Sequence, residues 1–298
     1  MPHQSDRQGE QKIRLLTFNI QAGTSTARYH HYVTHSWRQV LPHTQRVENL
    51  DAIAEFASSF DMVALQEADS GSLRSGYINQ TRYLANHAGM PFWCHQSNRK
   101  VGTVAYAGNG FLSRFEPDSV EEHRLPGVIP GRGTLLVRFG HGHGGLDVAV
   151  VHLALGKRAR AQQLRFLTRE LDSARHLVVM GDFNTAADSP PVADFCRTMA
   201  LRAPTAGLAT YPAWQPQRAI DHILVSKNLN AGTAQVLDVT HLYPNNKFFF
   251  PTFEHLGEDK GFTAERITGL VEDDLGQIWI GTYDEGLWRY DGMEFKRY

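Results

Sequence analysis

Six polar residues of types that can do acid–base or metal chemistry stand at the ends of apolar runs in the sequence. Asn19 follows LLTF, Glu67 follows MVALQ, His152 follows DVAVV, Asp182 and Asn184 follow VVMG, and Asp221 opens IDHILVS. A single Asp or Asn in such a place commonly serves a turn. Five runs with endings of these types are harder to explain as turns, and they indicate that strand ends converge on one site.

The residue types favour a hard cation and an activated water. Glu67 and Asn19, together with water, suit Mg²⁺, which takes one or two carboxylates and completes its shell with water and substrate phosphate. The set lacks the Cys and His clusters that hold zinc. Asp182 and Asn184 are two residues apart on an extended segment, so they point the same way and can address one attacking water. Gly181 would let the backbone approach closely.

Strands and helices must position these residues, and their order along the chain predicts a layered α/β domain. Strand-type runs cover 13–18, 61–67, 176–182, 219–226 and 234–239, with several more strands within 103–152. Helical spacing of apolar residues covers 43–60, 76–90 and 158–174. The apolar strands suit sheets that are covered on both faces.

Composition excludes some classes of protein. The 298 residues carry a net charge of −1, so charge does not indicate a nucleic-acid partner, although one stays possible. Residues 1–11 are expected to be a disordered tail, because they are polar and lack the apolar core of a signal peptide. Apolar runs long enough to span a membrane are absent from the sequence, and the expected location is cytoplasmic.

Five motifs in order resemble the endonuclease/exonuclease/phosphatase superfamily, which has the DNase I-like fold. They are LLTFNI, LQE, VHLALGKRARAQQL, GDFNT and IDHILVS, and the resemblance covers about residues 12–242. The resemblance implies a four-layered α/β sandwich that holds a divalent metal and cleaves phosphoester bonds. The expected cofactor is therefore Mg²⁺, with Mn²⁺ as an alternative.

The resemblance also implies a role for each matching residue. Glu67 and Asn19 are expected at the metal, and His152 is expected to stabilise charge on the phosphoryl oxygens. Asp182 is expected to orient or deprotonate the attacking water, and Asn184 to hold the phosphate or the water. Asp221 is expected to orient a second histidine. Asn109, in YAGNGFLSR, is either a phosphate contact or a simple turn residue.

The sequence departs from the family pattern where that second histidine should lie. The expected Ser-Asp-His motif and the core strand that follows it are replaced by YPNNKFFFPTF after VLDVTHL. His241 lies close to the expected position and is either a substitute or an ordinary loop residue. Because a positioned acid–base residue contributes about 10²–10⁴-fold in rate, its loss predicts a weak or inactive enzyme. The missing last strand would also expose a sheet edge.

The C-terminal part of the sequence changes style. Residues 243–266 are expected to be a linker, and 267–298 to form three or four short strands with turns at DDLG, YDEG and DGME. This stretch resembles one repeat of the two-component-regulator propeller family. One blade cannot close a propeller, so we expect a small β appendage without a function of its own.

Three functional hypotheses follow from these observations. The leading one is a Mg²⁺-dependent phosphodiesterase or phosphatase that acts on a phosphoester of unspecified class. The second is a catalytically impaired or dead chimera of this fold with a sensor-propeller fragment. The third is a DNA-repair nuclease, which would need a basic groove that the near-zero net charge does not favour.

Overall fold

The computed structural model divides the chain into two units, Met1–Asn245 and Asn246–Tyr298, which are described separately. In the first unit the structure describes residues 12–20, 43–72, 75–101, 105–127, 131–171, 175–211, 216–232 and 234–237. In the second unit it describes four strands between residues 267 and 297.

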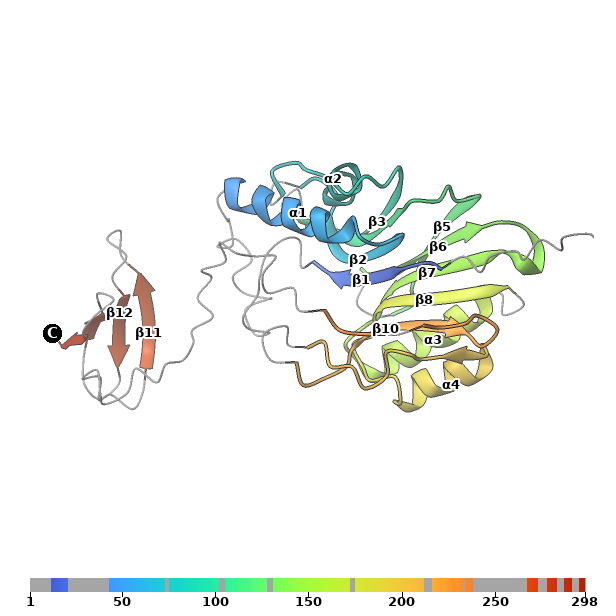
Figure 1. The fold of residues 1–298 in the computed structure, drawn as a ribbon. Helices are drawn as coiled ribbons and strands as arrows, with labels where there is room; N and C mark the ends of the chain where they lie inside the picture. The colour runs from blue at the N-terminus through green and yellow to red at the C-terminus, as the bar shows by residue number, and fades with distance from the viewer. Residues whose placement is uncertain are drawn as a thin grey trace, which may run out of the picture. The chain divides into compact units, whose positions relative to one another are not determined.

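Two sheets pack face to face in the first unit (Figure 1). The smaller sheet has the order β1-β2-β4-β3, formed by Leu15–Asn19, Met62–Asp69, Ala105–Ser113 and Phe92–Val101. Strands β1 and β2 run parallel, with Asn19 opposite Gln66, so their carboxyl ends meet at one edge of the sheet.

The larger sheet has the order β5-β6-β7-β8-β10-β9. Its strands are Ser119–Arg124 (β5), Gly133–Phe139 (β6), Leu146–His152 (β7), His176–Asp182 (β8), Asp221–Ser226 (β10) and Leu201–Arg202 (β9). Strands β7 and β8 are parallel, which places His152 opposite Asp182. Strand β10 runs antiparallel to β8 and begins with Asp221 opposite Asp182.

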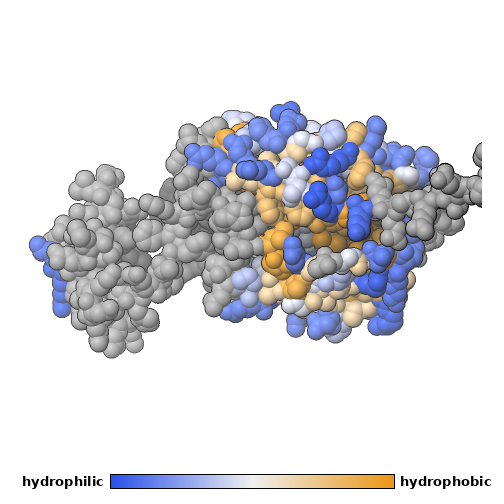
Figure 2. Space-filling view, viewed as in Figure 1, coloured by the Kyte–Doolittle hydropathy of each residue, from blue (hydrophilic) through white to orange (hydrophobic). Residues whose placement is uncertain are grey.

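Helices cover the outer face of each sheet. Helices α1 (His43–Ala57) and α2 (Gln80–His87) lie over the smaller sheet, and α3 (Lys157–Glu170) and α4 (Pro190–Thr198) lie over the larger one (Figure 1). One apolar core lies under each helix pair and a third lies between the sheets. In Figure 2 hydrophilic residues cover much of the upper border of the first unit, and hydrophilic and hydrophobic residues are mixed below it. The predicted four-layered α/β sandwich is confirmed.

Some predicted elements differ from the structure for local reasons. Helix α2 begins at Gln80 rather than near 76, because the Asn79 side chain accepts a hydrogen bond from Arg82 N and caps the helix there. The strand predicted over 234–239 is wrong for 234–237, which are irregular. The sequence analysis missed β3, which is rich in polar residues, and α4, which is only nine residues long.

Strand β1 has β2 as its one neighbouring strand among the described residues, and all five of its residues are half-buried. By contrast, seven of the eight residues of β2 are fully buried. The segment where the family's last strand was predicted to be missing, with His241, lies outside the described residues. The exposed sheet edge therefore stays a prediction.

The second unit contains an antiparallel four-stranded sheet in which each strand pairs with the next. The strands are Ile267–Glu272 (β11), Ile278–Thr282 (β12), Leu287–Tyr290 (β13) and Phe295–Arg297 (β14). The strands agree with the predicted positions of the turns. Four strands is the number in one propeller blade, and the resemblance to a propeller repeat stays a prediction.

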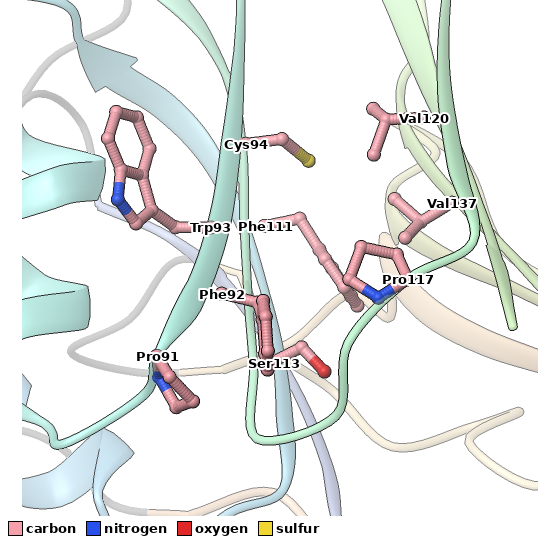
Figure 3. Close-up of a pocket in the computed structure, with 9 residues that line it drawn as sticks. All are labelled: Pro91, Phe92, Trp93, Cys94, Phe111, Ser113, Pro117, Val120 and Val137. Carbon is pink, nitrogen blue, oxygen red and sulfur yellow. The ribbon is translucent and has the colours of Figure 1, made fainter.

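A cavity of about 170 Å³ lies between the edges of the two sheets (Figure 3). Cys94 and Phe111 point into it from the smaller sheet, toward Val120 and Val137 of the larger sheet. Burial, with a smaller contribution from the charge of Glu122, raises the pKa of Cys94 to about 12, so its thiol stays protonated at neutral pH. The lining is mostly apolar, and we regard the cavity as a gap in packing.

Gly181 allows β8 to approach β7 at the end where His152 and Asp182 lie. Its φ is +144°, a conformation that residues with a side chain rarely adopt. A Cβ at this position would lie 2.0 Å from the carbonyl oxygen of Val151. The close backbone approach expected at Gly181 is therefore the approach of β8 to β7.

We expect Gly181→Ala to lower the free energy of unfolding by at least about 2 kcal/mol, because both the backbone conformation and the contact with Val151 become strained. Gly232→Ala is the matched control, since a Cβ there meets no atom within 4 Å. Urea denaturation of both variants measures the difference. Equal stability of the two variants would contradict the strained geometry at Gly181.

Candidate active site

Residues from both sheets meet in one network of close contacts. The Asn19 side-chain amide lies 3.4 Å from Asp182 Oδ2, and His152 Nε2 lies 3.5 Å from the same oxygen. His152 Nε2 also lies 3.9 Å from Glu67 Oε1. The structure therefore brings together four of the predicted residues, which come from four different strands.

Glu67 reaches this network from an irregularity in β2. The register between β2 and β4 shifts between Leu65 and Ala68, so Gln66 and Glu67 form a bulge. Glu67 has a φ of +57°, in the left-handed region that residues other than glycine seldom adopt. Such strain costs about 1–3 kcal/mol and persists where surrounding structure imposes it, commonly at functional sites.

Asn184 is a second left-handed residue at the site, with a φ of +53°. This conformation brings its backbone N–H to 2.8 Å from Asp182 Oδ1. Its side-chain Nδ2 donates to the carbonyl oxygen of Leu153 at 2.9 Å. Asn184 therefore orients the Asp182 carboxylate and also anchors the loop that follows His152. Its predicted contact with phosphate or water stays a prediction.

Burial and neighbouring charges perturb the carboxyl group of Asp182. Its residue is only 5% exposed, and burial raises the pKa of its carboxyl group well above the usual range. The neighbouring charges of Asp221 and Glu67 raise this pKa further, whereas the Asn184 N–H and the charge of Arg132 lower it. A buried carboxylate among other carboxylates creates a place where a cation is favoured.

The sequence analysis missed Arg132, which contacts His152 directly. A guanidinium group donates hydrogen bonds and cannot accept them, so the contact between Arg132 Nη1 and His152 Nε2 assigns Nε2 as the acceptor. Burial, and secondly the charge of Arg132, lower the pKa of His152 well below its usual value. His152 is therefore neutral at pH 7. The signal in the sequence was GRG, a cation between two glycines just before β6.

Asp221 lies opposite Asp182 in the pairing of β10 with β8. The resemblance implies that a histidine is the partner of the Asp221 carboxylate. Among the described residues, Thr210 holds its carboxylate, because Thr210 Oγ1 donates to Asp221 Oδ2 at 2.6 Å. Burial raises the pKa of Asp221 to about 6, and the Thr210 hydrogen bond opposes that increase. The adjacent His222 packs against Phe183 and contacts the Thr185 carbonyl oxygen at 2.9 Å, away from this carboxylate.

Asn109 is fully buried behind the network. Its Nδ2 donates to the carbonyl oxygen of Gly133 at 2.8 Å and lies 3.5 Å from Gln96 Oε1. Gly133 directly follows Arg132, so Asn109 holds the strand end that carries the guanidinium group. Its predicted phosphate contact stays a prediction.

The oxygen donors near Asp182 fit a hard cation better than a transition metal. Within the described part of the chain, His, Cys, Asp and Glu side chains do not gather in a group of three or more that could hold a metal ion. Mg²⁺ needs only one or two carboxylates from the protein. Glu67 and the Asn19 amide can supply that smaller number. Burial is the main cause of the raised pKa of Asp182, and the negative charges of Asp221 and Glu67, which raise it further, favour a cation nearby.

A four-layered α/β sandwich with acidic, amide and histidine side chains at its strand ends defines the DNase I-like class of proteins. The sequence matches the model of the Endonuclease/Exonuclease/phosphatase family over residues 16–258. The chain belongs to this family. A comparison with curated proteins found no match.

Solved structures share the fold at low sequence identity. A family protein from Leptotrichia buccalis C-1013-b is 14% identical, with a TM-score of 0.57 over 77% of this chain and 93% of that chain. A family protein from Beutenbergia cavernae DSM 12333 is 16% identical, with a TM-score of 0.58 over 93% and 80%. The mannosyl-6-phosphatase from Bacteroides thetaiotaomicron VPI-5482 is 14% identical, with a TM-score of 0.55 over 76% and 90%. At these identities the likeness shows the fold alone.

The helices described by the structure include none that is long and apolar enough to cross a membrane.

The raised pKa of Asp221 predicts how stability depends on pH. Between about pH 4 and pH 6 the native state binds this proton more tightly than the unfolded chain, so stability falls as pH rises through that range. Without metal, we therefore expect Asp221→Asn to stabilise the protein at pH 7.5, by up to about 3 kcal/mol. The gain should shrink as pH falls toward 4.

Denaturation in EDTA at several pH values measures this effect. Asp194→Asn is the control, because Asp194 is exposed on α4. A variant Asp221→Asn that is less stable than the parent at pH 7.5 would contradict the electrostatic account.

Proposed function

We propose that this protein is a Mg²⁺-dependent phosphoester hydrolase. The observation that carries the proposal is the network that joins Asn19, Glu67, His152 and Asp182 across the two sheets. Membership of a generally hydrolytic family supports the reaction class. One structure of similar fold is a mannosyl-6-phosphatase, which is compatible with a phosphomonoester as substrate.

Asp182 is the group that orients or deprotonates the attacking water. The Asn184 N–H fixes Oδ1, and the Asn19 amide lies beside Oδ2, so the carboxylate is held in one orientation. The raised pKa of Asp182 lies nearer to neutral pH than that of an ordinary carboxylate. Asp182 is therefore a stronger proton acceptor and a better general base.

His152 and Arg132 supply the environment for the transferring phosphoryl group. Arg132, which is partly buried, brings a positive charge against the neutral imidazole of the buried His152. Phosphoryl transfer depends mainly on positioning and on stabilising negative charge, and such charges act more strongly when they are buried. The guanidinium group can also bind two phosphate oxygens at once.

Glu67 and Asn19 would hold the metal ion. Bound there, Mg²⁺ (or Mn²⁺) would act as a Lewis acid toward a phosphate oxygen. The left-handed conformation of Glu67 directs its carboxylate to the contact with His152, at the centre of the network.

The contact between Thr210 and Asp221 supports the alternative of an impaired enzyme. A threonine hydroxyl is neutral and does not deliver a proton at pH 7 as an imidazolium does. If no histidine from outside the described residues joins Asp221, the leaving group lacks a general acid from this position. The rate should then be reduced by about 10²–10⁴-fold relative to a complete site.

Hydrolysis of bis-p-nitrophenyl phosphate and p-nitrophenyl phosphate tests the proposal. We expect turnover with Mg²⁺ or Mn²⁺ that disappears in EDTA, and losses of at least about 100-fold in Asp182→Asn and Glu67→Gln. The exposed Glu55→Gln on α1 is the matched control. A folded parent protein without metal-dependent turnover on either compound would leave the impaired chimera as the better description.

Arg132→Ala should lower kcat by about 100-fold, because the variant loses the fixed charge beside His152. Added guanidinium ion should restore part of this activity, whereas Arg132→Lys should keep the charge but lose the paired donors. Arg114→Ala is the control, since Arg114 donates to the carbonyl oxygens of Ser58 and Phe60, outside the site. Equal rates in the parent and in Arg132→Ala would remove Arg132 from the mechanism.

A further inference from the structure

Helix α3 contains a buried glutamine that bonds two separate loops. Gln163 is 1% exposed, and its Oε1 accepts a hydrogen bond from Ala154 N at 2.8 Å. Its Nε2 donates to the carbonyl oxygen of Pro126 at 3.0 Å. It belongs to the stretch KRARAQQL, which supplies no group to the reaction described above.

The first of these loops continues directly from His152. Leu153 N donates to the carbonyl oxygen of Asp182 at 2.9 Å, and Leu153 O accepts from the side chain of Asn184 at 2.9 Å. The next residue, Ala154, is the one that bonds to Gln163. This loop is therefore tied to the reacting end of β8 on one side and to α3 on the other.

The second loop carries Arg132. It joins β5 to β6, and Leu125 N donates to the carbonyl oxygen of Arg132 at 3.0 Å, so the two ends of the loop are bonded together. Pro126, which Gln163 holds, directly follows Leu125. A displacement of Pro126 is therefore transmitted to the residue that touches His152.

We propose that Gln163 is a positioning residue that sets the placement of Arg132 against His152. The inference rests on the proposed function. It gives helix α3 a part in the reaction through Arg132, without a contact between α3 and the substrate. Both ends of the buried amide are bonded, so neither loop can shift without leaving a buried polar group unpaired. That cost fixes the two loops at one separation.

The two loops should not respond equally when Gln163 is replaced. Arg160 donates to the carbonyl oxygens of Ala154 and Leu155, so the first loop keeps an anchor on α3. The second loop loses the bond at Pro126. The consequence should therefore fall on Arg132 more than on His152 or Asn184.

The decisive experiment is a double-mutant cycle with Mg²⁺ at saturation. Gln163→Met keeps the shape of the side chain but removes both hydrogen bonds, and we expect it to lower kcat by about 10- to 100-fold. In the Arg132→Ala background the same change should have almost no further effect, because the group that Gln163 positions is gone. Gln162→Met, at the exposed neighbouring glutamine, should match the parent in both backgrounds.

Two outcomes would overturn the proposal. One is a Gln163→Met variant with the parent's kcat. The other is an equal fold loss in both backgrounds, which would mean that Gln163 acts on general stability and not through Arg132. If Gln163→Met does not fold, Gln163→Glu takes its place, because an ionised carboxylate still accepts from Ala154 N but cannot donate to Pro126 O.

Amide hydrogen exchange separates this inference from the proposed function. Gln163→Met should speed exchange at Leu125, whose N–H bonds to Arg132, more than at Leu153, whose N–H bonds to Asp182. A parent protein without turnover would contradict the proposed function, but amide exchange at Leu125 and Leu153 could still be measured in it. Unchanged exchange at Leu125 defeats the link through Gln163 even in an active enzyme.

Discussion

The burial of Asp182 between two sheets is the constraint on which the site depends. A carboxylate removed from water costs several kcal/mol unless donors or cations compensate. Here the Asn184 N–H, the Asn19 amide and the charge of Arg132 act on one group whose neighbours include two further carboxylates. These compensating groups come from both sheets and from the loop between β5 and β6. The site therefore exists only when the layers are assembled. The chemistry of the site therefore depends on the folded α/β sandwich.

The backbone around Asp182 is held in conformations that a chain does not adopt freely. Glu67 and Asn184 lie in the left-handed region, and Gly181 brings β8 so close to β7 that a Cβ would overlap Val151. Each of these conformations is unfavourable locally and needs the surrounding packing to impose it. The consequence for function is precision, because side chains on a strained and fully packed backbone have few alternative positions.

The strand-end residues could be predicted from sequence because each follows an apolar run that marks a buried strand, and parallel strands end at one edge. The partners of these residues could not be predicted in the same way. Arg132 stands in the loop before β6, 20 residues before His152, and Thr210 stands 11 residues before Asp221. Neither lies in a periodic pattern that points to its target. The helix over 158–174 was predicted from apolar spacing, but the same spacing gives no reason for a buried polar Gln163. Contacts between loops depend on tertiary packing, and short or polar elements such as α4 and β3 carry weak patterns.

In the described part of the site the positive charge comes from a guanidinium group, whereas the resemblance implies an oriented histidine. An aspartate that orients a histidine provides a charge that depends on pH, since the imidazole gains and loses a proton near neutrality. Among the described residues, Asp221 accepts a hydrogen bond from a neutral hydroxyl, and His152 is neutral because of burial and of Arg132. Among the described residues, the positive charge that acts on Asp182 is the guanidinium group of Arg132. In the proposed hydrolysis, the leaving group has to obtain its proton from water or from a residue beyond those described.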